Sequence, residues 1–215
     1  MILGLEDALR DGAAALRLAL SNEQVGKLIE YLGLLEKWNR VYNLTAVREP
    51  SLMLTHHLLD SLAVVQPLER QVGSGPWNLL DVGSGGGLPG VVLALCFPEA
   101  RVTCIDAVAK KVAFVQQVAA SLGLGNLTGV HGRVEAHTDL HDVVASRAFA
   151  SLPDFVKWTR LSLAPGGVWM AMKGKHPDEE IAKVAAEVDV FHVEQLQVPG
   201  LDAERCIVWM KPKAA

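Results

Sequence analysis

Two kinds of hydrophobic pattern divide the chain. Up to about residue 70, apolar residues recur at the spacing of amphipathic helices, which predicts a helical N-terminal cap over residues 1–70. One of these helices is predicted to begin at a capping box, in which the side chains of Ser21 and Gln24 each cap the other residue's backbone N–H. After a turn-rich linker at 71–76, short apolar runs alternate with helical segments, so we predict one compact α/β unit over residues 71–215.

Seven short runs in the second part predict seven strands. They lie at residues 77–82, 101–106, 127–131, 142–146, 167–172, 191–198 and 206–211. Helical segments at 91–95, 108–122, 152–163 and 177–188 separate most of them, which predicts a mostly parallel sheet with right-handed crossovers. The last two runs alternate in polarity and are joined by a polar loop, so we expect them to form a terminal antiparallel hairpin.

A glycine-rich segment follows the first predicted strand. Gly83, Gly85, Gly86 and Gly87 come directly after the apolar run, and Pro89 suits the first turn of the next helix. Glycines permit positive φ angles and let a ligand approach the backbone closely. A strand, a glycine turn and a helix N-terminus at the carboxyl edge of a parallel sheet together predict a ligand site.

Two ligand classes fit this segment. Gly85, Gly87 and Gly90 match the G-x-G-x-x-G pattern of dinucleotide sites, but the match is weak and lies one turn late. Asp81 with alternate glycines from Gly83 onward instead resembles the first motif of Rossmann-like S-adenosylmethionine methyltransferases, where the acid would lie beside the cofactor's positively charged amino group. We therefore expect an α/β, class I methyltransferase fold with seven strands. A tight turn without a ligand and an NAD-dependent oxidoreductase remain as alternatives.

Three strand ends carry further candidates. Asp106 closes the second strand, where an acid can accept the ribose hydroxyls of an adenosine, whether from NAD or from S-adenosylmethionine. Arg133 to Glu135 follow the third strand, where a backbone segment commonly frames an adenine. Arg147 ends the fourth strand, and its planar guanidinium suits a carboxylate or a phosphate.

Composition limits the partners. The formal net charge of −4 gives no global case for nucleic acid, so RNA would need a local basic patch. Candidates near the carboxyl edge are Lys110, Lys111, Arg133, Arg147, Lys173 and Lys175. The three cysteines have no metal-ligand spacing, which favours reduced thiols and no metal. Without an apolar segment of membrane-spanning length or a signal peptide at the start, we expect a cytoplasmic protein with no membrane partner.

Several short motifs, taken together, resemble one bacterial family. In chain order they are Asn43-Leu-Thr45, His57-x-x-Asp60-Ser61, Asp81-Val-Gly-Ser-Gly-x-Gly-Leu-Pro-Gly90, Ser146-Arg-Ala-Phe149 and Leu196-Gln-Val-Pro199. They look like the 16S ribosomal RNA guanine-N7 methyltransferases of the RsmG family, once called glucose-inhibited division protein B. The resemblance runs from about Glu36 to Val208, and the first forty or so residues carry little of it.

The resemblance implies methyl transfer from S-adenosyl-L-methionine to N7 of a guanine in the 530 loop of 16S ribosomal RNA. The RNA would be part of the small ribosomal subunit or its precursor, the other product would be S-adenosyl-L-homocysteine, and the enzyme would act as a monomer. By position, the resemblance implies that Gly83 and Leu88 line the cofactor and that Val134 and Glu135 bracket its adenine. Arg147 would contact either the cofactor or the RNA. The family often has proline where Gly86 stands here, which would loosen the loop slightly.

The expected chemistry needs no general base. N7 of guanine carries a lone pair and no proton at neutral pH, so catalysis can rest on placement and on exclusion of water. The chain lacks the Asn-Pro-Pro-Tyr motif of exocyclic-amine methyltransferases and the Pro-Cys motif of cytosine-C5 enzymes. We expect no certain catalytic residue, with Arg147 as the candidate, and expect His57, Asp60 and their neighbours to hold the N-terminal cap against the cofactor site. Two rivals are a small-molecule methyltransferase and an RNA-binding module that has lost catalysis.

Overall fold

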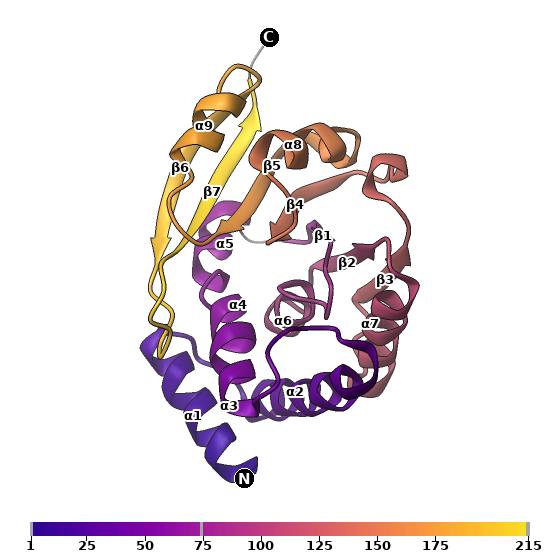
Figure 1. The fold of residues 1–215 in the computed structure, drawn as a ribbon, viewed down its shortest axis with the longest axis vertical. Coiled ribbons are helices and arrows are strands. Elements are labelled where there is room, and N and C mark those ends of the chain that lie inside the picture. Colours follow the sequence, from indigo (N-terminus) through magenta and orange to yellow (C-terminus); the bar gives the residue numbers. More distant parts are fainter. Residues whose placement is uncertain (1, 74, 214–215) are drawn as a thin grey trace.

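A twisted seven-stranded sheet forms the centre of the computed structural model, which describes residues 2–73 and 75–213 (Figure 1). Its strands are β1 (Asn78–Val82), β2 (Arg101–Asp106), β3 (Leu127–His131), β4 (His141–Arg147), β5 (Leu163–Lys173), β6 (Val188–Leu196) and β7 (Arg205–Pro212). Their order in the sheet is β3-β2-β1-β4-β5-β7-β6. Strands β1 to β5 are parallel, and β7 is antiparallel to both β5 and β6. The predicted mostly parallel sheet with a terminal hairpin is confirmed.

Helices cover both faces of the sheet. The N-terminal ones are α1 (Ile2–Ala15), α2 (Asn22–Tyr42), α3 (Pro50–Met53), η1 (Leu54–Leu59), α4 (Asp60–Leu62) and α5 (Val65–Val72). The later ones are α6 (Gly90–Cys96), α7 (Ala109–Leu122), η2 (Val134–Ala136), α8 (Leu152–Thr159), η3 (Arg160–Ser162) and α9 (Asp178–Val184). Helices α8 and α9 lie on one face, whereas α6, α7 and the N-terminal helices lie on the other (Figure 1).

Strand residues alternate between two hydrophobic clusters, one on each face. Leu79 packs in the cluster that contains α2, α6 and α7, and the next residue, Leu80, packs in the cluster that contains α8. In β7, Trp209 belongs to the first cluster and Met210 to the second. Because successive side chains on a strand point to opposite faces, a sheet covered on both faces requires continuous apolar runs.

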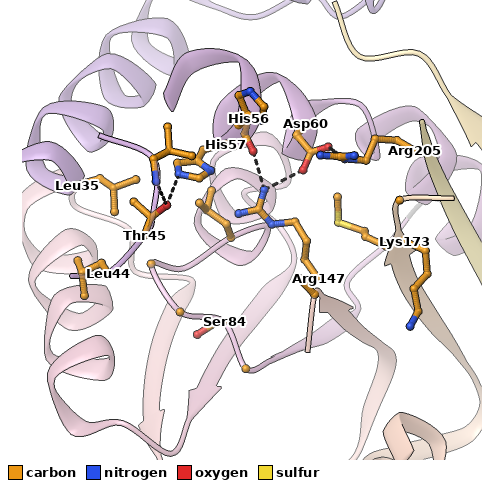
Figure 2. Close-up of a pocket in the computed structure, with 18 residues that line it drawn as sticks. Leu35, Leu44, Thr45, His56, His57, Asp60, Ser84, Arg147, Lys173 and Arg205 are labelled. Carbon is orange, nitrogen blue, oxygen red and sulfur yellow. Dashed lines mark hydrogen bonds and ion pairs between the residues drawn. The ribbon is translucent and has the colours of Figure 1, made fainter. Parts of the chain in front are cut away.

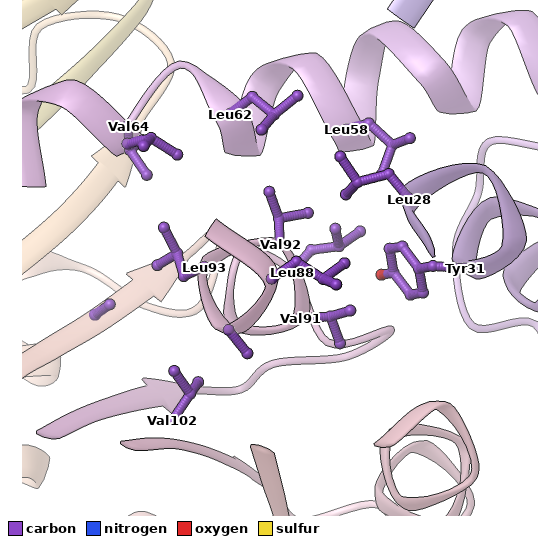
Figure 3. Packing of buried hydrophobic residues seen from close by; sticks show 14 of the residues in the cluster. Leu28, Tyr31, Leu58, Leu62, Val64, Leu88, Val91, Val92, Leu93 and Val102 are labelled. Atoms are coloured by element: carbon purple, nitrogen blue, oxygen red, sulfur yellow. The ribbon is translucent and has the colours of Figure 1, made fainter. Parts of the chain in front are cut away.

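Helix α6 is buried on every side. All its residues from Gly90 to Leu95 are buried, so its apolar run is more than the single sheet-facing stripe of a surface helix. One side packs toward the sheet near Val102, and the other meets Tyr31 of α2 and Leu58 of η1 (Figure 3). The N-terminal helices therefore share a core with the sheet, and the division at residue 70 stays a prediction.

Several predicted boundaries need correction. The apolar pattern predicts a first helix over residues 3–20, but α1 ends at Ala15, because Arg17 adopts a positive φ of 58°. The sequence also predicts one helix over residues 52–67, which the structure interrupts. Its part η1 is a π-helical segment between α3 and α4, and such segments often occur at functional sites. Strand β5 begins at Leu163 rather than at residue 167, because Leu163 already pairs with His141 ahead of a register shift. Ser74 of the predicted linker lies outside the described residues.

No helix within residues 2–73 and 75–213 is long and apolar enough to cross a membrane.

Candidate active site

The glycine loop between β1 and α6 lies at the carboxyl edge of the sheet. Gly83, Gly85 and Gly87 have φ angles of 65°, 58° and 82°, in the left-handed region that favours glycine. The loop is held from two sides. Gly85 N–H donates to Oδ2 of Asp106 at 3.0 Å, and the Tyr31 hydroxyl of α2 donates to the Gly86 carbonyl at 2.6 Å. Its path is thus fixed by both the sheet and the N-terminal helices.

Asp81 lies beneath this loop. Its side chain is buried, and its Oδ2 accepts a hydrogen bond from Gly90 N–H at 2.8 Å. Burial raises the pKa of this carboxyl to about 7, although the bond from Gly90 opposes the shift. Asp81 lines neither of the two cavities described below, so its visible role is to position the start of α6. Its predicted contact with a cofactor amino group stays a prediction.

A cavity of about 360 Å³ lies on the β2–β3 side of the loop. Asp106 lines it and is buried, with its Oδ1 accepting Val108 N–H at 2.8 Å. Val134 and Glu135 of η2 line the same cavity, as does Phe149. The structure thus brings together the sequence candidates for ribose and adenine contacts. Residues Val82, Gly83, Ile105, Ala107, Lys111, Gly132, Arg133, Ala148 and Trp158 complete the wall.

A second cavity, of about 460 Å³, lies on the N-terminal side of the loop. Gly83, Ser84, Gly85, Gly86 and Leu88 form its floor. Its other walls come from α2, the segment after α2, η1, the end of β4 and the starts of β7 and of the turn after β5 (Figure 2). Chain segments far apart in sequence therefore build this larger cavity.

A buried carboxylate joins two arginines at the wall of the larger cavity. Asp60, whose side chain is 3% exposed, accepts a bond from Nη1 of Arg147 and another from Nε of Arg205, each at 2.8 Å. Nη1 of Arg147 also donates to the carbonyl of His56 at 2.9 Å. Figure 2 shows both guanidinium groups converging on Asp60. The wall thus carries two guanidinium groups that are held in place by one carboxylate, so its local charge is positive.

The segment after α2 is held against η1 beside this pair. Asn39 donates from Nδ2 to the Val47 carbonyl at 3.1 Å and accepts from Thr45 N–H at 2.8 Å. Oγ1 of Thr45 lies 2.9 Å from Nε2 of His57. Burial, reinforced by the positive charge of Arg147, lowers the pKa of His57 to about 4, so the ring is neutral at pH 7. Nδ1 of His57 has no hydrogen-bond partner within the described residues.

The two cavities meet where β1 and β4 end. Gly83 and Ala148 line both. Ala148 has a positive φ of 52°, and it separates Arg147, which lines the larger cavity, from Phe149, which lines the smaller one. The Phe149 ring packs so closely on Gly83 that a side chain at position 83 would overlap it. An elongated ligand could therefore extend along the loop from one cavity to the other.

The basic residues singled out from the sequence take different positions. Arg133 lies at the smaller cavity and pairs with Glu135 at 2.7 Å. Lys173 lines the larger cavity, but its ammonium group binds Glu180 at 2.8 Å and points away from the arginines (Figure 2). Lys110 and Lys175 are exposed and line neither cavity. Their role in RNA binding stays a prediction.

Sequence reasoning missed Arg205 as a site residue. A signal existed, because the first residue of an antiparallel strand lies at the same sheet edge as the last residues of its parallel neighbours. Arg205 begins β7, and the next residue, Cys206, pairs with Lys173 at the end of β5. Lys111 lines the smaller cavity and lies 3.8 Å from Asp106, whereas the sequence predicts it only as part of a local basic patch.

The arrangement suits binding and orientation rather than acid–base chemistry. It combines a buried acid at the smaller cavity, a glycine-rich loop along both cavities, and two arginines at the larger cavity. Across the described residues, no group of three or more His, Cys, Asp or Glu side chains could hold a metal ion.

Known structures define the class of protein. The methyltransferase NodS from Bradyrhizobium japonicum, solved with S-adenosyl-L-homocysteine, superimposes with a TM-score of 0.59 at 15% identity, covering 84% of this chain and 99% of that one. A SAM-dependent methyltransferase from Geobacter sulfurreducens, also in complex with S-adenosyl-L-homocysteine, gives 0.58 at 12% identity, covering 84% and 98%. The fold is thus that of the Rossmann-like, S-adenosylmethionine-dependent methyltransferases, as the sequence predicts.

Sequence relatives narrow this class to a family. The model of the GidB family, rRNA small subunit methyltransferase G, matches residues 24–208. Ribosomal RNA small subunit methyltransferase G of Acidovorax ebreus is 62% identical over 98% of this chain and 96% of its own length. The protein of that name from Polaromonas sp. is 61% identical over 99% and 96%. The chain belongs to the rRNA small subunit methyltransferase G family, which confirms the resemblance.

Proposed function

We propose that this protein transfers a methyl group from S-adenosyl-L-methionine to N7 of a guanine in the 530 loop of 16S ribosomal RNA. The observation that carries the proposal is the pair of joined cavities along the glycine loop, in a chain that belongs to this family. One cavity suits the adenosine half of the cofactor. The other suits its methionine half and the incoming base.

The residues present fit the cofactor. Asp106 keeps free lone pairs beyond those used by Gly85 N–H and Val108 N–H, so its carboxylate can accept ribose hydroxyls. Val134 and Glu135 would frame the adenine in the smaller cavity. Gly83, Gly85 and Leu88 line the larger cavity and would support the methionine half, and a side chain at Gly83 would overlap the Phe149 ring where the cavities meet. Gly87 lines neither cavity, so its contact with the cofactor stays a prediction from the sequence. Arg147 is placed to bind either the methionine carboxylate or an RNA phosphate.

The cofactor would supply an electrophilic methyl group on a sulfonium. The residues of this chain would orient the guanine and exclude water, because N7 has a lone pair and no proton to lose. The pKa of about 4 makes His57 a weak base, which agrees with a mechanism in which no group in the larger cavity has to accept a proton. Arg147 and Arg205 would orient the substrate from one wall.

RNA contact would be local. Lys110, Arg133, Arg147, Lys173 and Lys175 are the candidates for it, and several already have acidic partners. Such a modest patch favours a substrate already shaped by ribosome assembly, meaning the small subunit or a precursor, over naked RNA. That substrate implies a cytoplasmic enzyme, and we propose that it acts as a monomer.

The test uses tritiated S-adenosyl-L-methionine with small subunits from a strain that lacks this gene. Borohydride–aniline cleavage, which cuts at N7-methylguanine, would then map the product. We expect incorporation and a single cleavage in the 530 loop. Incorporation at another site would overturn the assigned guanine, and absence of cofactor binding in calorimetry would overturn methyl transfer altogether. Equal methylation of protein-free 16S RNA would contradict the preference for assembled subunits.

A further inference from the structure

A row of aromatic rings leads from the core to the surface beside the larger cavity. Tyr31 and Phe114 are fully buried, with ring centroids 6.2 Å apart. Trp38 lies 5.4 Å from Phe114 and 5.2 Å from Tyr42. Tyr42, the last residue of α2, is 39% exposed. The outermost ring is thus supported from behind by a packed series and presents its outer side to solvent.

The position of Tyr42 relative to the cavity is fixed. Asn43 takes a left-handed conformation, with φ 50°, and turns the chain at the end of α2. Leu44, Thr45 and Val47, which follow at once, line the larger cavity. Two hydrogen bonds, one donated and one accepted by the Asn39 side chain, hold this segment in place. Tyr42 therefore stands at the start of the segment that forms the mouth of the cavity.

Exposed lysines and an exposed apolar residue lie on the helices that carry the row, where Arg40 and Glu36 pair with each other. Lys37 precedes Trp38 on α2, and Lys110 lies one turn before Phe114 on α7. Both lysines are exposed, and neither is in an ion pair with a described residue. Val41, beside Tyr42, is 69% exposed. An exposed aromatic ring on a helix that also carries an exposed, unpaired lysine is a feature of surfaces that bind single-stranded nucleic acid.

We propose that Tyr42 is a stacking platform for an unpaired base next to the target nucleotide. An unpaired loop can turn its bases outward, and each base offers a flat face that stacks on an aromatic ring whatever its identity. Lys37 and Lys110 would neutralise the adjoining phosphates. The inference rests on the proposed function, because it assigns Tyr42 to the RNA whose guanine enters the larger cavity.

The test compares three variants. Tyr42→Leu removes the ring but keeps an apolar side chain on Trp38, whereas Tyr42→Phe keeps the ring. Phe191→Leu is the matched control, because Phe191 is 38% exposed on β6, outside both cavities. Fluorescence anisotropy would measure binding of a labelled single-stranded oligonucleotide with the loop sequence and of its duplex form. Steady-state methyl transfer to small subunits would give KM for the RNA substrate and KM for S-adenosyl-L-methionine separately.

We expect Tyr42→Leu to weaken single-strand binding and raise KM for the RNA substrate about tenfold, the usual contribution of one stacked base. Its KM for S-adenosyl-L-methionine and its kcat should stay unchanged. Tyr42→Phe and Phe191→Leu should behave as wild type, and duplex binding should change in none of the three. Equal single-strand binding by Tyr42→Leu and wild type would overturn the inference. So would a loss seen only with assembled subunits, which would indicate contact with a ribosomal protein.

Failure of the proposed function has a different signature. If the wild-type protein transferred no methyl group to any small subunit, the proposed function would be overturned. The oligonucleotide assay would still decide the role of Tyr42, because it requires neither cofactor nor transfer.

Discussion

The two cavities at the carboxyl edge differ in how the chain builds them. The smaller one takes all its lining from residues between Val82 and Trp158, most of them directly after strands β1 to β4. The larger one takes its lining from between Leu35 and Arg205, and it needs α2, η1, the glycine loop and β7 together. One is a local product of the strand ends, and the other exists only once distant segments have packed.

This difference suggests that the smaller cavity serves cofactor binding, and that the larger cavity serves substrate choice. A strand-end acid and a glycine loop recur wherever this fold binds an adenosine. The smaller cavity therefore has the features that proteins of this fold share. The larger cavity is shaped by the N-terminal helices and by Arg205. Substrate choice should therefore be sensitive to the N-terminal helices, whereas cofactor binding should depend mainly on the loop.

Gly83→Ala should have the largest effect, because Gly83 lines both cavities. A Cβ there would overlap the Phe149 ring, and the φ of 65° adds strain of roughly 1–2 kcal/mol. We expect affinity for S-adenosyl-L-methionine to fall at least about 100-fold, or about 2.7 kcal/mol, by calorimetry. Gly123→Ala is the control, since Gly123 has a φ of 63° but no atom within 4 Å of its Cβ position. Equal binding by both variants would contradict the assignment of the loop.

Asp60→Ala should separate the two cavities. It leaves Arg147 and Arg205 without their shared counter-charge, so we expect the free energy of unfolding to fall by about 3 kcal/mol in urea denaturation. Methyl transfer to RNA at saturating cofactor should fall more than about tenfold, a loss of about 1.4 kcal/mol in transition-state stabilisation. Cofactor affinity should fall much less, because Asp106 lies in the other cavity.

A matched control exists on the surface. Glu194→Ala breaks the Arg70–Glu194 pair, in which Arg70 is 59% exposed, and should cost less than about 1 kcal/mol. If Asp60→Ala weakened cofactor binding as strongly as transfer, Arg147 would belong to the cofactor rather than to the RNA.

Local patterns in the sequence predicted the smaller cavity well. The alternation of strands and helices gives the sheet, and the residues that follow each strand end must lie at one edge, so Asp106 and Glu135 could be expected together. Every predicted strand exists, although β5 begins earlier because His141 pairs with Leu163 around a bulge. Such pairings depend on a partner strand and leave no mark in the local pattern.

The larger cavity could be predicted only in part. Resemblance to a family singled out His57 and Asp60, but helical periodicity gave no sign of the π-helical segment η1 that carries His57. Arg205 lies 145 residues from the carboxylate that it binds. No spacing rule connects residues so far apart, because their meeting depends on β7 inserting between β5 and β6.

Tyr31→Phe should have a smaller effect on stability and on cofactor affinity, because Tyr31 connects the N-terminal helices to the glycine loop. The Tyr31 hydroxyl on α2 donates a hydrogen bond to the Gly86 carbonyl, and loss of the hydroxyl leaves this buried acceptor unpaired. We expect the free energy of unfolding to fall by about 1–2 kcal/mol and cofactor affinity to fall severalfold. Thermal denaturation with and without S-adenosyl-L-methionine would measure both. Tyr42→Phe, which removes an exposed hydroxyl, should leave both quantities unchanged, and an equal effect would count against the role of Tyr31.

The smallest effect in the wild type should be the dependence of stability on pH between about pH 4 and 6.5, because two buried groups, one beside the larger cavity and one beneath the glycine loop, have opposite effects. His57 has its pKa lowered from 6.5 to about 4 by burial, so in this window the unfolded chain binds a proton that the native protein does not. Stability contributed by His57 is therefore lost as pH falls. Asp81 has its pKa raised from 3.8 to about 7, so the native protein binds the extra proton and its contribution grows as pH falls. Each slope is at most about 1.4 kcal/mol per pH unit, and the two have opposite signs.

Single variants should reveal the pH dependence that each group contributes to the free energy of unfolding. With His57→Asn, the free energy of unfolding should increase on going from pH 6.5 to pH 4.5 relative to wild type. With Asp81→Asn it should decrease over the same range, because only the histidine contribution remains. Urea denaturation at constant ionic strength would measure both curves. Parallel curves for the two variants would mean that these groups titrate alike in the native and unfolded states, and that burial beside the larger cavity and burial beneath the loop have no opposing effects on stability.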